Sequence, residues 1–126
     1  MKSILVDAWN TFVTENGIDQ DLKKLLDTFP NPKIILTNAD PQECIRYGIV
    51  NMPYEVFSLE HNPNKTDKAY YIRMLEFYNL DPNDVIYFEH NLEAVNSAIS
   101  VGINTYHYKK EDSLIELHSF LKINLV

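Results

Sequence analysis

Four segments of the sequence carry polar side chains that could act together on an anionic ligand: Asp7, Thr37-Asn38, Lys65 and Glu89-His90-Asn91. Three of these segments directly follow the short apolar runs ILV, KIIL and VIYF, and Lys65 lies in a loop rich in asparagine and proline. Hydroxyl, amide and ammonium groups are donors that suit a phosphate or a carboxylate ligand. A carboxylate that follows a buried strand suits a nucleophile or a metal ligand.

The apolar runs and the turn residues predict the elements that position these side chains. We expect strands at 3–7, 33–37, 54–59, 85–88 and 103–108, and helices at 20–28, 41–48, 66–79, 91–102 and 111–122. A hairpin is expected over 11–18, with a type I′ turn at Asn16-Gly17. Strands separated by helices pair in parallel, which predicts a three-layer α/β sandwich with a five-stranded, mainly parallel Rossmann-like sheet. Ligands of such sheets bind beyond the carboxyl ends of the strands.

Helical spacing of apolar residues predicts which helix faces are buried. We assign to the core Tyr71, Met74, Leu75 and Tyr78 of the third helix, Leu92, Val95 and Ile99 of the fourth, and Leu114, Leu117 and Leu121 of the last. These residues are interpreted as packing positions rather than as part of a ligand site.

Composition restricts the class of protein. A chain of 126 residues with 45% hydrophobic and 23% charged residues is expected to form one globular domain over 1–126. The net charge of −7 argues against nucleic acid and anionic membranes as partners. No apolar run approaches the roughly 18 residues that a membrane-spanning helix needs. Cys44 is the single cysteine, so no disulfide framework is expected and the cytoplasm is the expected compartment.

The motifs resemble those of the haloacid dehalogenase (HAD) superfamily along nearly the whole chain. The family's Asp-x-Asp-x-Thr after the first strand is similar to Asp7-Ala8-Trp9-Asn10-Thr11, and its Ser or Thr after the second strand is similar to Thr37. The lysine that opens a helix corresponds to Lys65 in NKTDKAYY, and the fourth motif resembles FEHNLEAVNSAISVG from Phe88 onward.

The resemblance implies a phosphatase-type hydrolase without a cap domain. Asp7 would be the nucleophile, and Thr37, Asn38 and Lys65 would bind the phosphoryl group. In the family, a magnesium ion is held by the first aspartate and by an acid of the fourth motif. Here the candidate ligands are Asp7, Glu89 and His90, although Glu89 and His90, as neighbours in a strand, are expected to point to opposite faces.

Two substitutions depart from the family pattern. Trp9 replaces the second aspartate, the general acid, and His90 replaces a metal-binding aspartate, so Mg²⁺ is expected to bind weakly or not at all. Asp7-Ala8-Trp9 also resembles the Asp-Ala-Tyr of the dehalogenases, which act without metal. His90 is interpreted as a metal ligand, a substitute acid or base, or a residue retained after loss of function. Trp9 is interpreted as a stacking platform or, preferably, as an apolar plug.

Two functions remain open from the sequence. The first is a hydrolase with Asp7 and His90 in catalytic roles, acting on a small phosphorylated molecule with an acidic leaving group. The second is a non-catalytic descendant that binds a ligand or a protein partner, with a homo-oligomer as a further expectation. The remaining histidines are interpreted as surface or structural residues: His61, His107 and His118.

Overall fold

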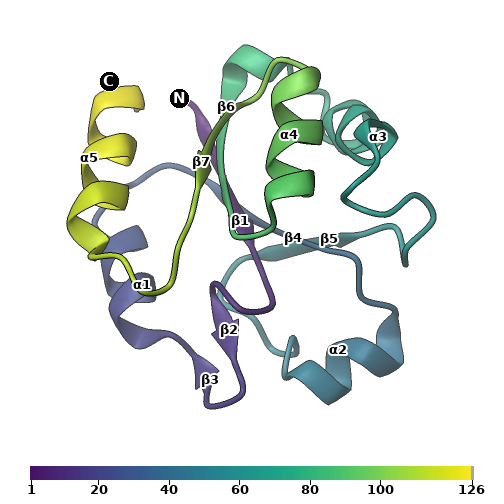
Figure 1. Ribbon diagram of the computed structural model, residues 1–126, viewed down its shortest axis with the longest axis horizontal. Helices are drawn as coiled ribbons and strands as arrows, with labels where there is room; N and C mark the ends of the chain where they lie inside the picture. Colours follow the sequence, from purple (N-terminus) through teal and green to yellow (C-terminus); the bar gives the residue numbers. More distant parts are fainter. Residues whose placement is uncertain (126) are drawn as a thin grey trace.

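The computed structural model describes residues 1–125 and is built around one parallel sheet (Figure 1). Its strands are β1 (Ser3–Asp7), β4 (Lys33–Thr37), β5 (Glu55–Ser58), β6 (Val85–Glu89) and β7 (Asn104–His107). They lie in the order β5-β4-β1-β6-β7, and every neighbouring pair is parallel. A small antiparallel ribbon of β2 (Val13–Thr14) and β3 (Gly17–Ile18) follows β1.

Helices cover both faces of the sheet, as Figure 1 shows. The helices are α1 (Gln20–Leu26), α2 (Pro41–Tyr47), α3 (Lys68–Tyr78), α4 (Leu92–Ser100) and α5 (Leu114–Asn124), with a short 3-10 turn at Pro82–Asp84. α1 and α5 lie on one face of the sheet, and α3 and α4 lie on the other. The predicted three-layer α/β sandwich is therefore confirmed, and its sheet is entirely parallel.

The alternation of side chains along β1 explains the two layers of core. Ile4 and Val6 belong to the cluster that packs with α1 and α5, whereas Leu5 between them belongs to the cluster that packs with α3 and α4. Successive side chains of a strand point to opposite faces, and all three residues are fully buried. A strand that is covered on both faces is expected to be mostly apolar, and between Ser3 and Asp7 this one is.

Capping residues set the helix starts, and two helices begin later than predicted. α3 begins at Lys68 because the Asp67 side chain accepts a hydrogen bond from the backbone N–H of Ala69. α5 begins at Leu114 because Ser113 caps it in the same way through the N–H of Ile115. A side-chain acceptor at the N-cap satisfies a backbone donor that has no partner within the helix.

Two local predictions are wrong. In α4, Val95 is buried as predicted, together with Ala94 and Ala98, whereas the other two predicted residues, Leu92 and Ile99, are 55% and 51% exposed. The small side chains of the two alanines pack inward, whereas the prediction had placed the larger leucine and isoleucine side chains on the buried face.

The hairpin forms, but its turn is not type I′. That turn needs a positive φ at both central residues, and of Asn16 and Gly17 only Gly17 has one, at 96°. The pairing of Thr14 with Gly17 places the turn on residues 15 and 16 instead.

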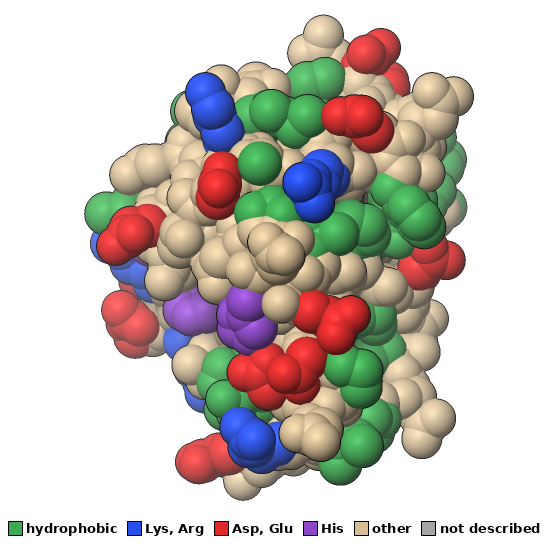
Figure 2. All heavy atoms as spheres, turned by 90° about the vertical axis from the view of Figure 1, so that its right-hand side faces the viewer, with side chains coloured by type: hydrophobic (Ala, Val, Ile, Leu, Met, Phe, Trp, Pro, Cys, Tyr) green, Lys and Arg blue, Asp and Glu red, His purple; other side chains and the backbone are tan. Residues whose placement is uncertain are grey.

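The face of the molecule in Figure 2 carries side chains of both charges among hydrophobic ones. In the view of Figure 2, basic side chains are scattered singly, and histidine side chains lie beside acidic ones near the middle of the face. Among residues 1–125, no helix combines the length and the apolar character needed to cross a bilayer.

Candidate active site

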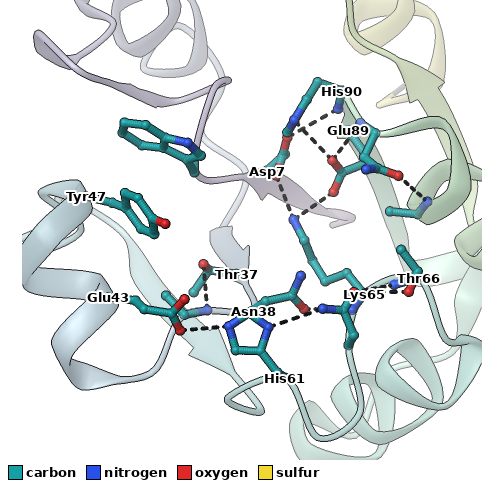
Figure 3. A pocket seen from close by; sticks show the side chains of 15 residues that line it. Asp7, Thr37, Asn38, Glu43, Tyr47, His61, Lys65, Thr66, Glu89 and His90 are labelled. Carbon is teal, nitrogen blue, oxygen red and sulfur yellow. Dashed lines mark hydrogen bonds and ion pairs between the residues drawn. The ribbon is translucent and has the colours of Figure 1, made fainter.

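A cavity of about 210 Å³ lies at the carboxyl ends of the central strands (Figure 3). Segments that are far apart in sequence bring its side chains together: Asp7 at the end of β1 with Trp9 beyond it, Thr37 and Asn38 at the end of β4, Lys65 before α3, and Glu89 and His90 at the end of β6. Glu43, Tyr47, His61, Asn64 and Thr66 complete most of the remaining wall. All the segments singled out in the sequence therefore line one cavity, at the edge where parallel sheets bind ligands.

The carboxylate of Asp7 is buried and held on both oxygens. Its side chain is 2% exposed, and Oδ1 accepts a hydrogen bond from Nζ of Lys65 at 2.6 Å. Oδ2 accepts hydrogen bonds from the Thr11 hydroxyl at 2.6 Å, from the backbone N–H of His90 at 3.2 Å and from Nδ1 of His90. Asp7 is thus fixed by one ammonium group, one hydroxyl and one histidine.

The carboxylate of Glu89 lies beside that of Asp7. Oε1 accepts hydrogen bonds from Nζ of Lys65 at 2.7 Å and from the hydroxyl of Tyr87, and Oε2 accepts one from the backbone N–H of Asn91 at 3.0 Å. Nδ1 of His90 lies 3.3 Å from Oε2. Glu89 and Tyr87 are two positions apart on β6 and therefore share a face of the sheet.

The expectation that Glu89 and His90 point to opposite faces is wrong for this site. His90 follows the last residue of β6, where the strand alternation no longer fixes the side-chain direction. Its ring turns back over the strand end, so that ligand atoms of Asp7, Glu89 and His90 all lie within 4.8 Å of one another. Strand periodicity is a guide only inside the strand.

The charges of these groups stabilise one another. Burial acts to lower the pKa of Lys65, but the charges of Asp7 and Glu89 outweigh it and raise that pKa. Burial acts to raise the pKa of Glu89, but Lys65 and the hydrogen bond from His90 lower it below the usual range. Hydrogen bonds to Asp7 and then to Glu89 raise the pKa of His90 to about 10. The site therefore pairs two carboxylates with two cations at neutral pH.

Thr37 and Asn38 frame the opposite wall of the cavity. The Thr37 hydroxyl is nearly buried and accepts a hydrogen bond from the backbone N–H of Ala39 at 3.2 Å. Oδ1 of Asn38 accepts one from the backbone N–H of Lys65 at 2.7 Å, which ties the strand end to the loop before α3. In Figure 3 the amide nitrogen of Asn38 points into the cavity. The phosphate-binding role of these residues stays a prediction.

Trp9 forms a wall of the cavity and does not fill it. Its ring centroid lies 4.6 Å from that of Tyr47 in α2, and both residues line the cavity. The interpretation as a plug is therefore replaced by that of an aromatic wall. Aromatic pairs at this separation attract each other beyond the area that they bury.

His61 is a site residue that the sequence analysis missed. Its Nε2 lies 2.7 Å from Oε1 of Glu43 and its Nδ1 lies 3.2 Å from Nδ2 of Asn64, at the rim of the cavity. The nearness of His61 to Lys65 in sequence was the one available signal. Tyr47 and Glu43 gave none, because their helix reaches the site only through the fold. Thr11 was visible as the last residue of the first motif.

The donor set of Asp7, Glu89 and His90 does not fit Mg²⁺ as it is arranged here. Mg²⁺ requires near-octahedral oxygen ligands, and an imidazole nitrogen suits it poorly. Each carboxylate oxygen of Asp7 and Glu89 already accepts a hydrogen bond from a protein donor. A cation between them would have to displace the ammonium group of Lys65 or the ring of His90.

Comparison with known proteins gives matches to structures. No protein-family model and no curated protein matches the sequence. A HAD family enzyme from Bacteroides thetaiotaomicron, crystallised as an aspartate-to-alanine mutant with magnesium and inorganic phosphate, aligns with a TM-score of 0.74 at 11% identity. That alignment covers 93% of this chain and 98% of the other.

Two further structures extend the likeness. The core domain of a candidate phosphoglycolate phosphatase from Streptococcus pneumoniae aligns with a TM-score of 0.62 at 11% identity, over 97% of this chain and 96% of its own. A candidate beta-phosphoglucomutase from Thermotoga maritima aligns with a TM-score of 0.51 at 18% identity, over 79% of this chain and 50% of its own. These likenesses show that the chain has the fold of HAD enzymes.

Proposed function

We propose that this protein is a phosphohydrolase of the HAD type in which Asp7 is the nucleophile. The observation that carries the proposal is the position of the Asp7 carboxylate, which is buried at the end of the central strand, anchored by Lys65 and His90, and open to a cavity with Thr37 and Asn38 on its far wall. The HAD enzymes of similar fold, one of them crystallised with inorganic phosphate, support the same reaction class.

The two oxygens of Asp7 have different surroundings. Oδ2 accepts three hydrogen bonds from Thr11 and His90, whereas Oδ1 accepts one, from Lys65, among residues 1–125. A carboxylate oxygen has about two lone-pair sites, so Oδ1 keeps one for attack. Oδ1 is therefore assigned as the attacking atom, and Oδ2 as the atom that holds the carboxylate in place.

The reaction then has two steps. Oδ1 of Asp7 attacks phosphorus, the bond from phosphorus to the leaving oxygen breaks, and the leaving group departs with the electron pair. Water next attacks the phosphorus of the aspartyl phosphate, the bond to Oδ1 breaks, and inorganic phosphate leaves while solvent takes the proton of the water. Asn38 and Thr37 donate hydrogen bonds to the phosphoryl oxygens, and the positive charge of Lys65, whose three N–H groups face Asp7, Glu89 and the carbonyl of Leu36, attracts them.

The leaving group defines the substrate class. Trp9 occupies the place of the general acid and cannot donate a proton to a departing oxygen, so the leaving group must be stable as an anion. The aromatic pair of Trp9 and Tyr47 provides a flat apolar wall for a ring. The cavity of about 210 Å³ is smaller than the roughly 300 Å³ at which typical ligand pockets begin. Small aryl phosphates and acyl phosphates fit these requirements.

The test is turnover of p-nitrophenyl phosphate and acetyl phosphate by the purified protein. We expect phosphate release that is lost in Asp7→Asn, an isosteric change that removes the nucleophile. Asp112→Asn, at an exposed position that does not line the cavity, is the matched control and should retain full activity. Equal rates for the wild type and Asp7→Asn would contradict the proposal.

A non-catalytic binding protein is the second candidate, and the position of Trp9 favours it. An aromatic wall in place of the general acid preserves a cavity for an anion with a ring or for a side chain of a protein partner, without the means to turn it over. Saturable binding of inorganic phosphate together with no turnover of either ester would support this candidate.

A further inference from the structure

Two cationic side chains join the two carboxylates of the site. Nζ of Lys65 lies 2.6 Å from Oδ1 of Asp7 and 2.7 Å from Oε1 of Glu89, and so connects one oxygen of each. Nδ1 of His90 donates to Oδ2 of Asp7 and lies 3.3 Å from Oε2 of Glu89, and so connects the other two oxygens. A divalent cation between two carboxylates would make the same connections.

The nitrogen donors and a magnesium ion exclude each other. Nδ1 of His90 faces two carboxylate oxygens, so it carries a hydrogen and offers no lone pair to a metal. A cation that approached the same oxygens would also be repelled by the buried ammonium group of Lys65. All four carboxylate oxygens of Asp7 and Glu89 already have protein hydrogen-bond donors, so no added positive charge is needed to bind them.

We propose that His90 and Lys65 together take the place of the divalent cation, so that this site binds a phosphoryl group and holds Asp7 for attack without a metal ion. The proposal rests on the proposed function only in taking a phosphoryl group as the ligand. In this arrangement His90 positions Asp7 for attack. Replacing His90 by an oxygen ligand should then make phosphate binding depend on Mg²⁺ again.

The ligand reaches the site from the side of His90. The His90 side chain is 36% exposed, whereas those of Asp7, Lys65 and Glu89 are 2%, 9% and 0% exposed. The three buried groups therefore form the floor of the site, and the histidine ring is the most exposed of the four side chains. Fixed donors in a site that is shielded from water stabilise an anion without reorganisation.

Calorimetry with inorganic phosphate tests the proposal on the wild-type protein. We expect the same dissociation constant in the presence of a chelator and in excess Mg²⁺, and no heat of binding or shift in melting temperature on titration with Mg²⁺ alone. Tighter phosphate binding with Mg²⁺, or Mg²⁺ binding that Asp7→Asn abolishes, would overturn the proposal. Failure to bind phosphate under either condition would overturn its anion-binding part.

His90→Asp is the decisive variant because it returns an oxygen ligand to this position. We expect the variant to bind Mg²⁺ and to bind phosphate about tenfold more tightly with Mg²⁺ than with chelator, which is about 1.4 kcal/mol. His118→Asp, the same change at an exposed position on α5, should remain insensitive to Mg²⁺. A folded His90→Asp variant that ignores Mg²⁺ would count against the assignment. If His90→Asp does not fold, the same titrations with phosphate and Mg²⁺ on the wild-type protein and on His90→Asn test the proposal instead.

Turnover separates this proposal from the proposed function. A protein that binds phosphate equally with and without Mg²⁺ but hydrolyses no ester contradicts the hydrolase and supports the metal-independent site. A protein that hydrolyses esters only with Mg²⁺ supports the hydrolase and overturns the replacement of the cation by His90 and Lys65.

Discussion

His90 donates a hydrogen bond from Nδ1 to Oδ2 of Asp7, although 83 positions separate the two residues in the sequence. The sheet explains the contact, because β1 and β6 are neighbouring parallel strands with Val6 beside Phe88. Residues that follow this pair leave the sheet side by side at its carboxyl edge. The register of two apolar strands therefore sets the distance between the proposed nucleophile and the histidine that positions it.

The first prediction concerns the pH dependence of stability. The pKa of His90 is raised to about 10 in the folded protein, first by the hydrogen bond to Asp7 and then by that to Glu89, from an ordinary value of 6.5. A pKa that is higher in the folded state adds stability that is fully present below the unfolded value and is lost as the pH rises through the folded value. His90→Asn should therefore lower the free energy of unfolding most below about pH 6.5, and the deficit should shrink steadily as the pH rises from 6.5 to about 10.

Urea denaturation of both proteins across this range measures the deficit. His118→Asn, which removes an exposed imidazole on α5, controls for the loss of a histidine elsewhere. A deficit that stays constant or grows between neutral and alkaline pH would contradict the paired state of His90.

Tyr87 and Tyr71 form a natural matched pair for the second prediction. The Tyr87 hydroxyl donates to Oε1 of Glu89, whereas the Tyr71 hydroxyl is buried and has no hydrogen-bond partner among residues 1–125. Tyr87→Phe should lower the free energy of unfolding by about 1.5–3 kcal/mol, the contribution of a hydrogen bond to a charged group. Tyr71→Phe removes a polar atom that makes no bond and should be neutral or stabilising. Chemical denaturation of the two variants checks both signs, and equal losses would contradict the assignment.

The third prediction concerns Lys65, whose ammonium group stands between two buried carboxylates. Lys65→Met removes that charge and leaves Asp7 and Glu89 facing each other. We expect a loss of about 3–5 kcal/mol in the free energy of unfolding, as for other buried ion pairs that lose one partner. Adding Glu89→Gln should restore part of the loss, since one of the repelling charges is then gone. Lys24→Met at an exposed position on α1 is the control, and a similar loss there would refute the argument.

Most of the fold follows from patterns that are local in sequence. The apolar runs that end in Asp7, Thr37 and Glu89 are buried on both faces of the sheet, so they had to be strands of a covered parallel sheet. The rule that ligands bind at the carboxyl edge then located the cavity. The buried face of α4 was predicted only at Val95, because Ala94 and Ala98, which pack beside it, carry little hydrophobic signal.

The details of the site depend on contacts that no local pattern encodes. His61 and Tyr47 reach the cavity through a loop and a helix whose placement depends on the whole fold. The direction of the His90 side chain was missed because it lies just beyond the strand, where alternation stops. Which donors bond to the carboxylate oxygens of Asp7 and Glu89 depends on interatomic distances that only the structure gives. The sequence therefore suggested a weakened metal site but could not show that protein donors bond to these oxygens instead.

The fourth prediction concerns Trp9 and the acidity of the leaving group. Because the indole ring cannot protonate a departing oxygen, turnover of aryl and acyl phosphates should far exceed that of alkyl phosphates. Trp9→Asp places a carboxyl group where the family has its general acid, two positions after Asp7. We expect it to raise the rate on alkyl phosphates relative to aryl phosphates by up to about 10²–10⁴-fold, the usual contribution of a general acid.

Trp9→Asn is the matched control. Asparagine has nearly the same shape as aspartate but no carboxyl proton to donate, so this variant loses the contact between Trp9 and Tyr47 without gaining a general acid. The measurement is kcat/KM for a series of esters of increasing leaving-group pKa, where the slope should be steep for the wild type and for Trp9→Asn and shallower for Trp9→Asp. Equal rates of the wild type on aryl and alkyl esters would show that some other group supplies the proton.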